Sequence, residues 1–305
     1  MSHFFEVLLK FFGDRVKTDF PLAPLTTFGI GGPADYFVSI GNEEELDFAV
    51  SAARRAGTPV TALGFGSNVL ISDLGARGLV FVLDGDFKKM FFEPGGCLKA
   101  GAGARLPKFV TFAAEQGRTG MEPLAGVPGT VGGGIFMNAG TREGEIKDHL
   151  KSVRVYSLQE GKFQDLSSSA IEFGYRRSSL QKGGHIIVSA IFDFPIANDK
   201  KEALDRIKRL MERRKATQPI DTKNVGSIFK NPPGDFAARL IEQAGLKGER
   251  RGGAVVSPIH ANFIVNAGGA KAEDVLALAE KIKAVVLEKF GVSLEPEFRC
   301  LGEFQ

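Results

Sequence analysis

Two glycine-rich stretches could hold a large anionic ligand against bare backbone. The first, GFGSN at residues 64–68, directly follows a strand predicted over 59–63. Successive glycines let several backbone N–H groups point into one concavity, which suits a pyrophosphate. The stretch lacks the last glycine of the dinucleotide fingerprint GxGxxG, and it is not a Walker A loop. Taken alone, it is more often just a tight turn.

The second stretch is GVPGTVGGG at 126–134, followed by MNAG at 137–140. Ordering so many glycines costs conformational entropy that another interaction must offset. A flat ligand lying against the backbone is the natural candidate. A glycine-rich connection between strands is the alternative, but no plain turn needs this length. We therefore favour a bound flat ligand.

A pair of arginines lies in YRRSS at 175–179. On an extended segment, Arg176 and Arg177 would point to opposite faces. At most one of them would then face a site, and the other would be solvated. Taken alone, the motif favours a surface pair.

A candidate proton donor lies in NVGSIFKNP at 224–232. Gly226 exposes the backbone beside Ser227, while Lys230 and Asn231 add a cation and an amide. No histidine is close in sequence to activate Ser227, so an acid role suits it as well as a nucleophilic one. The alternative is a serine that only forms a turn.

Two glutamates occur in LEPEFR at 294–299. Alternation in a strand puts Glu295, Glu297 and Arg299 on one face, and Pro296 confines that strand to an edge or a rim. A surface ion pair is the alternative interpretation. The spacing does not choose between the two glutamates.

The elements that would position these motifs change in type along the chain. Up to about residue 195 the pattern predicts an α+β region of short strands joined by glycine turns, and beyond it a helix-richer domain. In the first region we predict helices over 42–57 and 107–117 and strands over 59–63, 79–83, 151–158 and 185–194. In the second we predict helices over 199–214, 235–245 and 271–290 and strands over 254–256 and 262–265.

Composition excludes several classes of protein. The chain of 305 residues is long enough for two or three domains, and its net charge of +3 is too small for a nucleic-acid footprint. Cys97 and Cys300 lie far apart and the histidines are scattered, so no metal site is expected. Neither a signal peptide nor a membrane span is predicted. We expect a cytoplasmic protein without membrane insertion.

Taken together and in this order, the motifs resemble the UDP-N-acetylenolpyruvoylglucosamine reductase family. The resemblance covers nearly the whole chain, roughly from Pro21 to Gly302. Any one motif is weak, but the ordered set is highly specific. The segments that carry it are TFGIGGPA, GFGSNVLISD, GVPGTVGGGIFMNAG, YRRSS, GSIFKNP, AGLKGERRGGAVVSPIHANFIVN and LEPEFR.

The resemblance implies an α+β fold in three parts. Residues 1–82 and 83–195 would be two FAD-binding subdomains of the vanillyl-alcohol-oxidase type. Residues 196–305 would form the substrate-binding domain, whose C-terminal strand returns to the active site. Between Arg176 and the helix at Asp199 the chain has no room for the tyrosine-bearing loop that one type of this family inserts. The chain therefore resembles the type without that loop.

The family's functional residues fall on particular positions of this chain. Its catalytic arginine, serine and glutamate fall on Arg176, Ser227 and Glu297, and Lys230 and Asn231 are expected to bind substrate. The expected cofactor-binding residues are Gly64, Gly66, Ser67, Asn68, Val69, Gly126, Pro128, Gly129, Gly132, Gly133, Asn138, Ala139 and Arg214.

The implied activity is NADPH-driven reduction of the enolpyruvyl group of UDP-N-acetylglucosamine enolpyruvate, giving UDP-N-acetylmuramate for peptidoglycan synthesis. FAD is expected to be non-covalent, because no histidine lies between His3 and His149 to tether it. NADPH and the UDP-sugar are the expected partners, with no nucleic acid, and the protein is expected to be a monomer. Three alternatives are another FAD-linked oxidoreductase of this fold, a nucleotide-sugar transferase and a non-catalytic flavin-binding module.

Overall fold

The computed structural model describes residues 2–304, which form two compact units built from interleaved segments. Unit 1 contains the residues up to Thr18, Tyr36–Phe65 and Gly78–Arg213. Unit 2 contains Asp19–Asp35, Gly66–Arg77 and the residues from Arg214 on. The chain therefore passes between the units several times.

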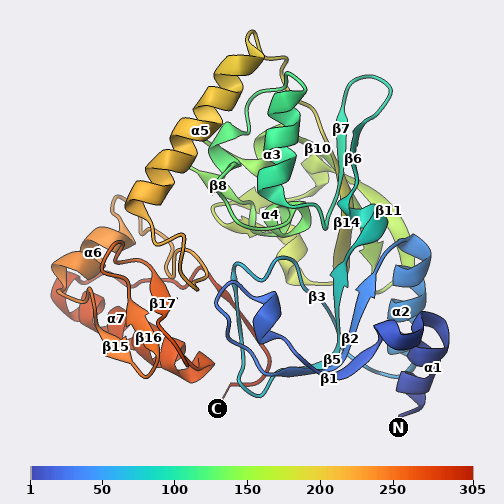
Figure 1. Cartoon of the computed structure of the whole chain (residues 1–305), viewed down its shortest axis with the longest axis horizontal. Helices are drawn as coiled ribbons and strands as arrows, with labels where there is room; N and C mark the ends of the chain where they lie inside the picture. The colour runs from blue at the N-terminus through green and yellow to red at the C-terminus, as the bar shows by residue number, and fades with distance from the viewer. Residues whose placement is uncertain (1, 305) are drawn as a thin grey trace. The chain divides into compact units, whose positions relative to one another are not determined.

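Unit 1 is built around a five-stranded antiparallel sheet (Figure 1). Its strands, in spatial order, are β11 (Lys162–Ser167), β10 (Leu150–Ser157), β14 (His185–Phe192), β7 (Leu98–Gly101) and β6 (Met90–Phe92). Buried side chains of β10 and β14, such as Val153 and Phe192, share one core with the helices α3 (Leu106–Glu115) and α4 (Val131–Met137).

A second core in unit 1 lies under the helices α1 (His3–Phe12) and α2 (Glu43–Arg55). The helix predicted over 42–57 forms α2, and Asn42 caps it, because its side chain accepts a hydrogen bond of 2.9 Å from the Glu45 N–H. The helix α1 was not predicted. It begins after Ser2, whose hydroxyl accepts from Phe5 N–H, and it buries Phe4, Leu8 and Phe12.

A four-stranded sheet has the order β1 (Lys17–Pro21), β2 (Pro33–Ile40), β5 (Ala76–Leu83) and β3 (Val60–Ala62). β3 pairs in parallel with β5 and leads into the first glycine motif, although its residues are half-buried or exposed and not buried as expected. Two-residue strands form the hairpins β8–β9 (Gly140–Thr141, Gly144–Glu145) and β12–β13 (Phe173–Gly174, Arg177–Ser178). Short 3-10 helices occupy Gly13–Arg15, Ala23–Leu25, Gly85–Lys88, Glu122–Leu124, Ile146–His149, Ser168–Ala170 and Ser179–Lys182.

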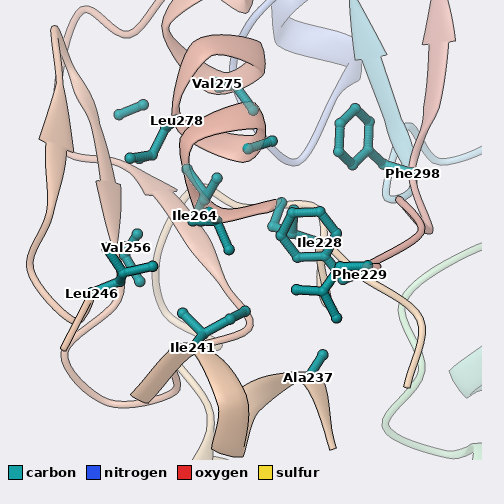
Figure 2. Packing of buried hydrophobic residues seen from close by; sticks show 14 of the residues in the cluster. Ile228, Phe229, Ala237, Ile241, Leu246, Val256, Ile264, Val275, Leu278 and Phe298 are labelled. Carbon is teal, nitrogen blue, oxygen red and sulfur yellow. The ribbon is translucent and has the colours of Figure 1, made fainter. Parts of the chain in front are cut away.

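Unit 2 packs two helices and small sheets around its own core (Figure 2). The helices are α6 (Ala237–Gln243) and α7 (Ala272–Phe290). One sheet contains β15 (Arg250–Arg251), β16 (Ala254–Val256) and β17 (Ile264–Asn266), and the other pairs β18 (Arg299–Leu301) in parallel with β4 (Val69–Ile71). The long helix α5 (Lys200–Thr217) runs from the last segment of unit 1 into unit 2.

The predicted helices and strands occur within a few residues of their expected bounds. The amphipathic pattern expected over 271–290, for example, forms α7 with Val275, Leu278 and Ile282 buried. Across residues 2–304, none of the helices combines the length and the apolar character needed to cross a membrane.

Candidate cofactor and catalytic site

The start of the first glycine motif, Gly64 and Phe65, lies beside the second glycine motif within unit 1. β3 ends at Ala62, and Leu63 N–H donates to Phe81 O at 2.8 Å before the chain turns at Gly64. A Cβ atom added to Gly64 would lie 3.0 Å from Thr130 Oγ1, which is tighter than ordinary contact. The start of the first motif therefore lies against the middle of the second, although the two are far apart in sequence.

Most of the second glycine motif forms a helix and not an extended segment that lines a ligand. Residues Val131–Met137 form the helix α4, and the Thr130 side chain caps it by accepting from Gly133 N–H at 3.1 Å. Gly132 is needed for packing, since a Cβ there would lie 2.8 Å from the Ala102 Cβ. Gly133 is exposed and thus leaves bare backbone on the helix surface. The glycines of this motif therefore serve packing as well as exposure of backbone.

Asn138 ends α4 with its backbone in the left-handed region, at φ 46°. Its side chain is fully buried, and Nδ2 donates to Glu145 Oε2 at 2.9 Å and to Gly174 O at 3.0 Å. Oδ1 is buried and has no hydrogen-bond partner among the described residues. An unpaired buried acceptor costs about 1–3 kcal/mol. FAD carries imide N–H and hydroxyl donors that could satisfy such an acceptor, so the residues present fit this cofactor.

Arg105 lies beside both motifs and was not among the predicted site residues. It precedes α3, and its backbone forms an isolated antiparallel bridge with Thr130. Its guanidinium carbon lies 3.0 Å from the centroid of the Phe65 ring. Burial lowers the pKa of the Arg105 guanidinium. A single arginine in the segment GAGAR carries no sequence signal for such a position.

Arg176 occupies a tight turn, so the extended segment expected around the two arginines is wrong at this position. Gly174 pairs with Arg177, which leaves Tyr175 and Arg176 as the two residues of the β12–β13 turn. Arg176 has φ 54°, a conformation that costs a residue with a side chain about 1–3 kcal/mol. Arg177 is exposed and Arg176 is half-buried. The two side chains therefore differ in exposure, but because of a turn and not because of strand alternation.

Side chains tie this turn to the end of α4. Ser178 Oγ and Gln181 Nε2 both donate to Phe136 O, at 2.7 and 2.8 Å. Gln181 Nε2 also lies 3.4 Å from Arg176 O, within hydrogen-bond range. With the bond from Asn138 to Gly174, these contacts hold the hairpin on the glycine-rich helix. Unit 1 thus places Arg176 next to the second glycine motif.

In unit 2, the segment that carries Ser227 pairs with the segment that carries Glu297. Glu297 N–H donates to Ile228 O at 2.8 Å, and Lys230 N–H donates to Glu295 O at 2.9 Å. Phe229 and Pro296 form an antiparallel bridge between them. The pairing therefore places Ser227 and Glu297 near each other on neighbouring segments.

Buried residues and amide side chains fix this pair of segments. Ile228 and Phe229 insert into the core of unit 2 (Figure 2). The Asn262 side chain bonds to both backbone polar groups of Phe229. Its Oδ1 accepts from the Phe229 N–H at 3.0 Å, and its Nδ2 donates to the Phe229 carbonyl at 2.8 Å. Asn68 Nδ2 donates to Glu297 O at 3.1 Å. The Asn68 amide, predicted to bind cofactor, therefore also positions the C-terminal segment.

The other predicted residues of unit 2 have distinct surroundings. Lys230 Nζ lies 2.5 Å from Glu295 Oε1, and the Glu295 side chain is 71% exposed. Asn231 Oδ1 accepts from Ala237 N–H at 3.1 Å. Arg214 donates to Gln218 Oε1 at 3.1 Å, and burial lowers the pKa of its guanidinium. In residues 2–304, no group of three or more His, Cys, Asp or Glu side chains could hold a metal ion.

Two family models and several curated proteins match this chain. Residues 34–167 match an FAD binding domain, and residues 218–301 match the C-terminal domain of UDP-N-acetylenolpyruvoylglucosamine reductase. A protein of that name from Lachnoclostridium phytofermentans is 42% identical over 293 residues, which are 95% of this chain and 94% of the relative. A namesake from Anaeromyxobacter dehalogenans is also 42% identical, over 98% of this chain and 89% of its own length.

Solved structures agree with these matches. The crystal structure of UDP-N-acetylenolpyruvylglucosamine reductase from Thermus caldophilus has a TM-score of 0.80 and 38% identity, covering 94% of this chain and 98% of the other. An alkyldihydroxyacetonephosphate synthase matches with a TM-score of 0.50 and 20% identity over 64% of this chain and 41% of its own, a likeness of fold alone.

Proposed function

The chain belongs to the UDP-N-acetylenolpyruvoylglucosamine reductase family, and on that premise we propose its reaction in detail. It reduces the enolpyruvyl group of UDP-N-acetylglucosamine enolpyruvate to give UDP-N-acetylmuramate. NADPH provides the electrons, and the product serves the synthesis of peptidoglycan precursors. The proposal includes action in the cytoplasm as a monomer.

The matches confirm the family that the ordered motifs indicated, together with the expected α+β fold of vanillyl-alcohol-oxidase type. They also confirm that the protein is a flavoprotein reductase whose cofactor is FAD. Identity of 42% over 95% of the chain to reductases disfavours the transferase and the non-catalytic module.

The observation that carries the proposed mechanism is the pairing of the Ser227 and Glu297 segments. The segment that carries the Ser227 hydroxyl lies beside the segment that carries the Glu297 carboxyl in unit 2, while Glu295 forms an ion pair with Lys230. A hydroxyl donor and a carboxyl group are the types needed to protonate and polarise a conjugated carboxylate substrate.

Each proposed catalytic residue has one task in this chemistry. FAD held at the glycine motifs, once reduced by NADPH, would supply a hydride to the β-carbon of the enolpyruvyl group. Negative charge then develops toward the substrate carboxylate, where the Arg176 guanidinium and a protonated Glu297 stabilise it. The resulting carbanion is a strong base, so the weakly acidic Ser227 hydroxyl can protonate the α-carbon.

Binding of the substrate and cofactor is assigned to residues around these groups. We assign Lys230 and Asn231 to binding of the substrate. Asn231 Oδ1 accepts from the Ala237 N–H, so the Asn231 group assigned to the substrate is the Nδ2 donor. The cofactor is assigned to the two glycine motifs with Asn138, whose unpaired Oδ1 supports this assignment. Arg214, a half-buried cation, completes the set.

An absorption spectrum and a rate measurement test the proposal. The purified protein should be yellow, and acid precipitation should release the colour into the supernatant because FAD is not covalently bound. NADPH oxidation should then depend on the enolpyruvyl UDP-sugar. Fast NADPH oxidation that is independent of the UDP-sugar and consumes oxygen would indicate an oxidase of the same fold.

A further inference from the structure

In unit 1, a second cation besides Arg176 lies beside the start of the first glycine motif and the second glycine motif. The Arg105 guanidinium carbon is 3.0 Å from the centroid of the Phe65 ring, and Phe65 stands between Gly64 and Gly66 of the first motif. The side chain is half-buried, and within residues 2–304 it forms no ion pair with a carboxylate. Withdrawing a guanidinium from water without an anionic partner is unfavourable.

The backbone around Arg105 joins the two motifs. Arg105 bridges Thr130, and the next residue, Leu106, donates its N–H to Gly129 O at 3.0 Å. Gly64 lies so close to Thr130 that a Cβ would be 3.0 Å from its hydroxyl oxygen. Arg105 therefore lies beside glycine backbone of both motifs. It also falls within residues 34–167, which match an FAD binding domain.

We propose that Arg105 binds the diphosphate of FAD. A guanidinium presents paired N–H donors in one plane, which match two oxygens of a phosphate group. The guanidinium carbon lies over the Phe65 ring, whose carbon atoms accept no conventional hydrogen bond, so the N–H donors stay available to a ligand. Among the anions that the enzyme handles, the FAD diphosphate fits the glycine-rich backbone beside Arg105 best.

The test compares flavins with and without phosphate groups. The protein is freed of FAD, and the dissociation constants of FAD and of riboflavin are measured by flavin fluorescence. For Arg105→Met we expect the FAD dissociation constant to rise about 10–100-fold, the range for a lost charge-assisted hydrogen bond. The riboflavin constant should change by less than about threefold, and Arg105→Lys should recover part of the loss. Lys108→Met removes an exposed cation from the first turn of α3, three residues after Arg105, and should leave both constants unchanged.

Salt dependence provides a second readout that does not need riboflavin. FAD affinity of the native protein should fall with ionic strength more steeply than that of Arg105→Met, because one charge contact is missing in the variant. Equal losses for FAD and riboflavin, with unchanged salt dependence, would show that Arg105 only supports Phe65. An unchanged FAD constant with a raised KM for the UDP-sugar would assign Arg105 to the substrate. Either result overturns the proposal, and the flavin dissociation constants are measured without the proposed reduction chemistry.

Discussion

At the scale of single residues, Glu295 and Glu297 have different surroundings, although strand alternation predicts both on the same face. Glu295 is 71% exposed and bonded to Lys230. Glu297 is half-buried, and its backbone N–H and carbonyl are both held, by Ile228 and by Asn68. The structure thus gives a physical reason to prefer Glu297, which the family resemblance alone had favoured.

Exchanging each glutamate for glutamine should separate their roles. Glu297→Gln should lower kcat by about 10²–10³-fold or more, because one stabilising group of the transition state is lost. Glu295→Gln should lower it by less than about fivefold, since exposed ion pairs contribute about 0–1 kcal/mol. Steady-state NADPH oxidation with the enolpyruvyl sugar measures both. The reverse ranking would place the catalytic carboxyl two residues earlier.

Ser227 should act in only one half of the catalytic cycle. Ser227→Ala should bind FAD and be reduced by NADPH at a near-normal rate, because no proton from Ser227 is needed there. Reoxidation by the enolpyruvyl sugar should slow by about 10²–10⁴-fold, the usual loss for a general acid. Ser227→Cys should recover part of the rate, because a thiol also donates a proton. Stopped-flow flavin absorbance follows each half, and equal slowing of both would show that the serine has a structural role.

At the scale of elements, the position of Arg176 depends on the contact between a hairpin and a helix. The two-residue turn holds Arg176 at φ 54°, and the side chains of Asn138, Ser178 and Gln181 bind it to α4. A backbone held in such a sparsely populated conformation persists when its surroundings determine it. The cofactor motif and the proposed catalytic arginine are therefore coupled through α4.

Gln181 should accordingly position Arg176. Gln181→Met keeps the side-chain length but removes the bonds to Phe136 O and Arg176 O, and should slow flavin reoxidation about 3–10-fold. Flavin reduction by NADPH should be unchanged. In an Arg176→Ala background the same change should have no further effect, because the residue that it positions is gone. The exposed Gln159→Met is the matched control. Additive losses in the double variant would contradict a positioning role.

At the scale of the whole molecule, each unit has hydrophobic cores of its own. The buried residues of unit 1 form two clusters, and those of unit 2 form a third, although each unit is assembled from separated segments. The division into two FAD-binding subdomains, 1–82 and 83–195, and a substrate domain, 196–305, stays a prediction.

Bound FAD should stabilise the folded protein measurably. At a free FAD concentration 100 times its dissociation constant, linkage predicts about 2.7 kcal/mol of added stability. For a cooperative unit of about 150–250 residues this raises Tm by roughly 5–10 °C. Differential scanning calorimetry of the FAD-free protein with and without FAD measures the shift, and NAD+ at the same concentration is the control. An equal shift with NAD+ would indicate non-specific stabilisation.

The amino-acid sequence by itself determined the features that depend on local patterns. The helices α2, α5 and α7 follow from caps and from periodic apolar residues, which act within a few positions of each other. The order of the motifs identified the family and its cofactor, because each motif is a local string of residue types.

Only the tertiary structure decided how those motifs meet. The glycine run forms the helix α4, and Gly132 is needed in it because Ala102, 30 positions away in sequence, leaves no room for a side chain. Arg105 reached Phe65, and Glu297 was separated from Glu295, through pairings between segments distant in sequence. Such contacts depend on how the whole chain packs, and the type of a single residue carries no record of its distant neighbour.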